Sequence, residues 1–346
     1  MRFCWPVAVA RIFALLVVTV SGWNSGSLLA GETFPEPDGH TFSIRWLGRY
    51  THSTSFDSTA GRGAAAWLAR LFLGDNSLHF RTPFGLAAAP SGDIWVLDQG
   101  AGVPFRIHPD AGRMERLSIP DGEPFPSLVD VAIAADGAAY FTDSRLGGVY
   151  CVAPGTATPR AFVSPGSLQR PTGIAVDPVS GRPCVVETAA HRIAILNADG
   201  SVHGTFGGRG DTPGRFNFPS YLTIDVQGRL YVVDAMNFRV QILDSVGTPI
   251  GWFGQIGDGS GDFARPKGIA LDSHGHIYVV DALFGAVQVF DGEGRLLTTF
   301  GRRGQGDGEF WMPTGIAIDS RDRIFVADGH NHCVQVFQLT GGSGDE

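Results

Sequence analysis

The chain has 346 residues, and its composition narrows the class of protein. It contains 48 glycines, about twice the usual share, while charged residues make up only 17 %. A hydrophobic content of 43 % excludes an intrinsically disordered chain, and so much glycine favours an all-β protein rich in tight turns. The formal net charge of −8 excludes an overall basic field for nucleic acid.

Residues 1–30 have the pattern of a secretory signal peptide. Arg2 and Arg11 precede an apolar run from Ile12 to Val20, and small residues follow it. We therefore predict cleavage after Ala30 or Gly22 and export to the periplasm or beyond the cell. An uncleaved N-terminal membrane anchor is the alternative. If the signal peptide is cleaved, we expect that the protein is not an integral membrane protein. We also expect a monomer.

Residues 41–48 have the pattern of an isolated strand, with an apolar pair before Gly48. The insertion that follows, 49–79, contains apolar residues at helical spacing: Ala64, Trp67, Leu68, Leu71 and Phe72. This spacing predicts a short amphipathic helix that ends before Gly74. We expect the helix to pack on the rest of the domain; docking on a partner or a membrane surface is the alternative.

Residues 80–339 contain six copies of one unit. The clearest anchors are Pro171 to Asp177, Pro266 to Asp272 and Pro313 to Asp319, and weaker copies begin at Pro83, Leu128 and Pro219. The equivalent positions are 85, 130, 173, 221, 268 and 315, so the unit recurs every 43 to 48 residues. Each unit has four short strand patterns, which predicts a six-bladed β-propeller spanning 31–346 as one domain.

The sixth unit lacks its fourth strand, because only a glycine-rich tail, 340–346, follows Phe337. Residues 41–48 resemble the fourth strands near Thr248 and Leu296. The sequence therefore predicts that this N-terminal strand completes the last blade and removes the open sheet edge.

These units resemble the NHL repeat family. The family pattern combines a Pro-x-Gly-Ile-Ala-Val-Asp anchor with Tyr-Val-Val-Asp and Asn-His-Arg-Val-Gln-Val-Phe strands. Its counterparts here include Tyr231 to Asp234 with Asn237 to Leu243, and Phe325 to Asp328 with Asn331 to Phe337. The resemblance implies a six-bladed propeller, and it implies no single activity because one fold carries many unrelated sites.

Two groups of residues could hold a cation. The second strands end in acidic residues that we expect at one level of the ring: Asp98, Asp143, Glu187, Asp234, Asp281 and Asp328. We favour a structural role for them, because an Asp before a turn usually accepts hydrogen bonds from nearby backbone amides. The other candidates, for zinc or calcium, are His191, His330 and His332 together with Asp328. We expect no cofactor.

The turns between second and third strands share one face, and loops on a rigid scaffold commonly bind ligands. We predict a non-catalytic scaffold that binds a protein, peptide or glycan there, through Arg145, His191, Asn237, Phe284, His330 and His332. The alternative is a metal-dependent lyase or hydrolase resembling the peptidyl-hydroxyglycine lyase. No catalytic residue can be named, since the common nucleophile, phosphate-loop and zinc motifs are absent from the sequence. RNA binding, as in tripartite-motif NHL domains, is opposed by the acidic charge and by export.

Overall fold

The computed structural model describes residues 32–35, 41–52, 55–57, 78–111, 113–119 and 122–341. The predicted signal peptide at 1–30, the predicted helix between Ala64 and Phe72, and the last residues of the tail lie outside the described residues, so these remain predictions. In the described part of the chain, no helix has the length and apolar character needed to cross a membrane.

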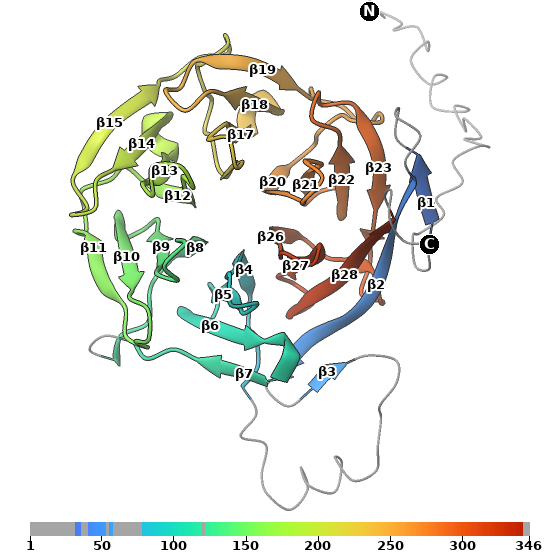
Figure 1. Cartoon of the computed structure of the whole chain (residues 1–346), viewed down its shortest axis with the longest axis horizontal. Helices are drawn as coiled ribbons and strands as arrows, with labels where there is room; N and C mark the ends of the chain where they lie inside the picture. The colour runs from blue at the N-terminus through green and yellow to red at the C-terminus, as the bar shows by residue number, and fades with distance from the viewer. Residues whose placement is uncertain are drawn as a thin grey trace, which may run out of the picture.

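Six sheets surround a central axis, and each forms one blade of a β-propeller (Figure 1). Blade 1 comprises β4 (Pro83–Ala88), β5 (Ile94–Asp98), β6 (Val103–His108) and β7 (Arg113–Arg116). Blade 2 comprises β8 (Leu128–Ile133), β9 (Ala139–Asp143), β10 (Gly148–Val152) and β11 (Arg160–Val163). Blade 3 comprises β12 (Pro171–Val176), β13 (Pro183–Glu187), β14 (Arg192–Leu196) and β15 (Val202–Gly207).

The second half of the ring repeats this arrangement. Blade 4 comprises β16 (Leu222–Ile224), β17 (Leu230–Asp234), β18 (Arg239–Leu243) and β19 (Pro249–Phe253). Blade 5 comprises β20 (Pro266–Leu271), β21 (Ile277–Asp281), β22 (Ala286–Phe290) and β23 (Leu296–Phe300). Blade 6 comprises β26 (Pro313–Ile318), β27 (Arg323–Asp328), β28 (Cys333–Gly341) and β2 (Thr41–His52), with β1 (Glu32–Pro35) and β3 (Ser55–Asp57) paired to β2.

Short elements join the blades. A parallel pair, β24 (Arg302–Arg303) and β25 (Glu309–Phe310), lies between blades 5 and 6. Single 3-10 turns occur at η1 (Pro109–Ala111), η3 (Thr188–Ala190) and η4 (Ala235–Asn237).

Burial follows the position of a strand within its blade. The second strands are buried along almost their whole length, because each lies between two strands and both of its faces pack on neighbouring blades. The outer strand β15 is mostly exposed or half-buried instead. Cys184 in a second strand, and Cys151 and Cys333 in third strands, are buried free thiols, so they pack as small apolar residues.

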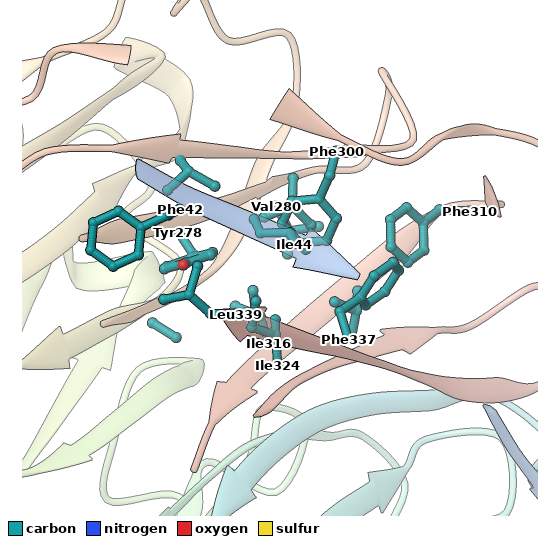
Figure 2. Packing of buried hydrophobic residues seen from close by; sticks show 14 residues of the cluster. Phe42, Ile44, Tyr278, Val280, Phe300, Phe310, Ile316, Ile324, Phe337 and Leu339 are labelled. Atoms are coloured by element: carbon teal, nitrogen blue, oxygen red, sulfur yellow. The ribbon is translucent and has the colours of Figure 1, made fainter. Parts of the chain in front are cut away.

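The N-terminal strand closes the ring, as the sequence predicts. β2 runs antiparallel to β28, with Ile44 opposite Leu339, and this pairing joins the two ends of the described chain (Figure 1). Phe42 and Ile44, both at most 2 % exposed, pack among buried residues of blades 5 and 6 (Figure 2). The indole nitrogen of Trp46 donates a 3.1 Å hydrogen bond to the side chain of Gln335 on β28. The strand extends to His52, four residues beyond the predicted end.

The innermost strands approach one another so closely that glycine is needed between them. A Cβ on Gly173 would lie 2.6 Å from the Cα of Tyr221, and one on Gly315 would lie 2.3 Å from the carbonyl oxygen of Phe84. Adjacent blades therefore touch through their backbones around the axis.

The ring has two different faces. We call the side that carries the turns between second and third strands, and the connections between blades, the loop face. The opposite side carries the turns between first and second strands, and we call it the turn face. The inner strands begin at the loop face. In five blades the first residue of the inner strand pairs with the last residue of the second strand, as Pro83 pairs with Asp98.

Removing the closing strand should destroy the cooperative unit. We expect a chain that starts at residue 80 to lose the cooperative thermal transition shown by the chain that starts at 31, because β28 would become an open edge. Circular dichroism melting compares the two. Equal melting curves would show that blade 6 does not need β2.

Two neighbours on β2 provide a finer test. Ile44→Ala should lower the free energy of unfolding by about 2–5 kcal/mol, because it leaves a cavity between blades 5 and 6. Arg45→Ala, at an exposed position, should change it by no more than about 0.5 kcal/mol. Denaturant titration measures both, and equal effects would contradict the packing of Ile44 in the core.

Candidate ligand site in the central channel

The inner strands of all six blades line a cavity of about 650 Å³ on the axis. Its wall consists mainly of small and aliphatic side chains, among them Ala88, Ile133, Val176, Ile224 and Ile318. Polar residues from the turns of blades 4 and 5 complete the lining at the turn face: Asp225, Gln227, Arg229, Asp272, Ser273 and His274. The volume is typical of small-molecule sites.

Toward the loop face, apolar residues from opposite sides of the channel meet. Val129 of blade 2 belongs to the same buried cluster as Tyr221 of blade 4 and Ile269 of blade 5, and Phe84 of blade 1 packs against it. Because these blades are not all neighbours, this contact crosses the channel. We call the cavity that extends from this contact to the turn face the cup.

Two polar side chains stand at the bottom of the cup. Five inner strands pair with a register shift near their start, as at Pro171 to Ile174. The third residue of the repeated anchor, which is the glycine of Pro-x-Gly, is glycine in four blades. It is Asp130 in blade 2 and Tyr221 in blade 4. Both residues line the cavity and both are at most 7 % exposed.

Asp130 is held by neighbouring backbone and hydroxyl groups. Its carboxylate Oδ2 accepts a 3.1 Å hydrogen bond from the backbone nitrogen of Ile174, in the next blade. Its own backbone nitrogen donates to the hydroxyl of Thr142, which in turn donates to the carbonyl oxygen of Thr172 at 2.5 Å. Burial raises the pKa of Asp130 to about 8, against the lowering effect of the backbone hydrogen bonds. At neutral pH its carboxyl is therefore mostly protonated and can donate.

Tyr221 brings a hydroxyl that has no hydrogen-bond partner within the described residues. Burial raises its pKa well above the ordinary value, and the nearby Asp130 raises it further. Leaving a buried hydroxyl unpaired costs about 1–3 kcal/mol, so a ligand that pairs with it recovers this loss. Two uncharged donors, from blades 2 and 4, are thus buried in the wall at the bottom of the cup.

None of the six loop-face residues predicted from the sequence lines the cup. Nδ1 of His191 accepts a 3.1 Å hydrogen bond from the backbone nitrogen of Phe218, and Nδ1 of His332 bonds the carbonyl oxygen of Arg81. Asn237 donates to the backbone oxygen of Gly210 and to Asp234. These three side chains connect parts of the scaffold, while Arg145 and His330 are exposed and Phe284 is half-buried.

The candidate metal ligands are not brought together. His191 lies in blade 3 and His332 in blade 6, on opposite sides of the ring, and each bonds a neighbouring loop. Asp328 accepts hydrogen bonds from the backbone of Trp311 and the side chains of Asn331 and Gln335. Across the described ranges, no three His, Cys, Asp or Glu side chains form a metal-binding group.

The ring of acidic residues has the structural role favoured by its sequence context. All six side chains are completely buried. Asp281, for example, accepts hydrogen bonds from the backbone nitrogens of Ala264, Arg265, Leu283 and Phe284, so it fixes both its own turn and the preceding connection. Asp143 fixes the backbones of Ser127, Arg145 and Leu146 in the same way.

Asp130 and Tyr221 are not among the site residues predicted from the sequence, although the signal was present. They are the two places where the repeated anchor replaces its glycine with a side chain. In a repeat scaffold such a replacement puts a chemical group in the wall of the channel, where the other four blades have none.

The raised pKa of Asp130 predicts a pH-dependent stability. The folded state holds this proton more tightly than the unfolded state, whose carboxyl titrates near 3.8. The protonated carboxyl of Asp130 therefore stabilises the fold fully below pH 3.8, and this stabilisation is lost as the pH rises through about 8. We expect Asp130→Asn, which keeps an acceptor for Ile174, to gain stability over the wild type as pH rises from 4 to 8.

Thermal melting across this pH range measures the effect. Asp136→Asn, an exposed change in the turn of the same blade, is the matched control and should follow the wild type. Parallel profiles for the wild type and Asp130→Asn would show that Asp130 has an ordinary pKa.

Comparisons with known proteins agree with the fold. The NHL repeat model matches residues 310–337. A comparison with curated proteins finds no significant match. Among solved structures, an auxiliary nutrient binding protein from Bacteroides ovatus has a TM-score of 0.64 at 15 % identity, with 86 % of this chain and 77 % of that chain covered.

Enzymes are also among the similar structures. A gluconolactonase from Xanthomonas campestris has a TM-score of 0.58 at 18 % identity, covering 90 % of this chain and 98 % of that chain. Virginiamycin B lyase from Staphylococcus aureus has a TM-score of 0.54 at 18 % identity, covering 75 % and 96 %. At these identities the likeness establishes the fold alone. The chain is a six-bladed β-propeller that carries an NHL repeat.

Proposed function

We propose that the protein is a binding propeller that takes a small uncharged polar ligand, or the end of a peptide or glycan, in its cup. The observation that carries this proposal is the unpartnered hydroxyl of Tyr221 beside the neutral carboxyl of Asp130. Both groups donate hydrogen bonds at neutral pH, so a carbonyl, hydroxyl or ether oxygen of the ligand would accept from them. The aliphatic wall would contact the apolar faces of the same ligand.

The similar structures support binding as a use of this architecture. The propellers of similar shape include auxiliary nutrient binding proteins from two Bacteroides species. Their identity to this chain is 13 % and 15 %, so they support the class of function and say nothing of its ligand.

Catalysis is the second candidate, and one observation favours it. A carboxyl with a pKa of about 8 can gain or lose a proton near neutral pH, as a general acid or base must. The metal-dependent form of this alternative, a lyase or hydrolase using zinc or calcium, would need ligands that the described residues do not bring together. Assays of ligand binding should therefore also follow turnover.

The loop face is the other candidate surface for a protein, peptide or glycan. Beside Arg145 and His330, it carries exposed apolar side chains at Phe218, Met236 and Leu283. Binding there leaves the cup empty, so variants on the two faces decide between them. Export also remains our proposal, based on residues 1–30, and the N-terminal residue of the protein recovered outside the cytoplasm would test it.

The test begins with a thermal-shift panel of neutral oligosaccharides and short peptides, followed by calorimetry on each hit. We expect Tyr221→Phe, which removes only the hydroxyl, to weaken binding about tenfold, and Asp130→Asn to change it as well. His330→Ala is the matched variant on the loop face and should bind like the wild type.

Three results would contradict the proposal. They are unchanged affinity in Tyr221→Phe, loss of affinity in His330→Ala, and conversion of the bound compound to product by the wild type but not by Asp130→Asn. The last result would establish the enzyme alternative instead.

A further inference from the structure

Three positively charged residues stand where the channel opens on the loop face. Arg170 is the residue directly before β12 in blade 3, Arg265 is directly before β20 in blade 5, and Lys267 is the second residue of β20. Blade 4 lies between the two groups, and all three residues stand at the loop-face ends of inner strands that line the channel. At the blade 4 position that matches Arg170 and Arg265 stands Phe218, which is 40 % exposed.

Lys267 is the sole lysine in the sequence. The corresponding inner-strand residues of the other blades are uncharged: Phe84, Val129, Thr172, Ser220 and Thr314. A half-buried ammonium group at this level therefore departs from the rest of the ring. Burial and the positive charges of Arg265 and Arg170 lower its pKa to about 8.

No acidic side chain in the described part of the chain forms an ion pair with any of these three residues. The acidic residues that end the second strands of these two blades, Glu187 and Asp281, are completely buried and already accept hydrogen bonds from the backbone of the adjoining loops. Three like charges without a counter-charge oppose one another, and an anion placed between them would reverse that cost.

We propose that Arg170, Arg265 and Lys267 form a binding site for an anionic group, a carboxylate or a phosphate, at the loop-face mouth of the channel. Arginine binds both groups through paired N–H donors, and the lysine adds a point charge. None of the three residues lines the cup, and Lys267 lies at the level of the apolar contact that closes its bottom. The two sites therefore take ligands of different chemistry at opposite ends of one channel.

The single lysine makes a direct measurement available. Protein labelled with ¹³C at the lysine ε-carbon gives one side-chain signal, which reports the protonation and surroundings of Lys267. We would titrate the purified protein with inorganic phosphate and, separately, with sodium acetate at constant ionic strength. We expect a saturable shift of this signal and a rise of the Lys267 pKa when the anion is bound.

The variants identify the site. The double variant Arg170→Gln with Arg265→Gln should bind the anion at least about tenfold more weakly, and Arg265→Gln alone should lie between it and the wild type. Arg45→Gln removes an exposed arginine from the outermost strand of blade 6 and should leave the titration unchanged. Melting curves confirm that each variant is folded. If the double variant does not fold, the comparison of Arg265→Gln with the wild type provides the test.

Both arms give a decision. Saturation by phosphate alone, or tighter binding of phosphate than of acetate, assigns a phosphate ligand. Saturation by acetate alone, or tighter binding of acetate, assigns a carboxylate. A linear shift with both salts, or an equal shift in the wild type and in the Arg265→Gln variant, would overturn the proposal. Such a result would show that the signal responds only to general ionic conditions.

Discussion

The pairing of β2 with β28 is the contact on which the rest of the structure depends. It brings a strand from the start of the described chain beside the last strand, and it buries Phe42 and Ile44 between blades 5 and 6. A propeller blade packs on both of its neighbours, so an incomplete blade would weaken two interfaces at once. Closure also fixes the distance between inner strands, which sets the width of the channel.

Within the closed ring, chemistry enters where the repeat departs from its own pattern. Four glycines let the inner strands pack backbone to backbone, while Asp130 and Tyr221 place polar groups in the wall of the channel. Lys267 is a similar departure one residue earlier in its strand. The buried acidic ring, which follows the pattern in every blade, serves the turns and leaves no free carboxylate. Regular positions thus build the scaffold, and irregular positions carry the candidate sites.

Much of the fold could be predicted because it depends on local patterns that recur six times. Repeat spacing, strand alternation and the missing fourth strand sufficed for the blade number and for closure by residues 41–48. The site was harder to predict. His191, Asn237 and His332 are polar loop residues whose hydrogen bonds go to the scaffold, and no sequence pattern separates such residues from free ones. The neutral state of Asp130 depends on burial from several blades, which only the assembled ring provides.

The central claim is that the cup is the ligand site. A crystal structure of the protein with the tightest compound from the binding panel tests this claim most directly. The account predicts that the compound lies in the cup, with an oxygen within hydrogen-bond distance of the Tyr221 hydroxyl and the Asp130 carboxyl. A compound bound on the loop face, above an empty cup, would contradict it.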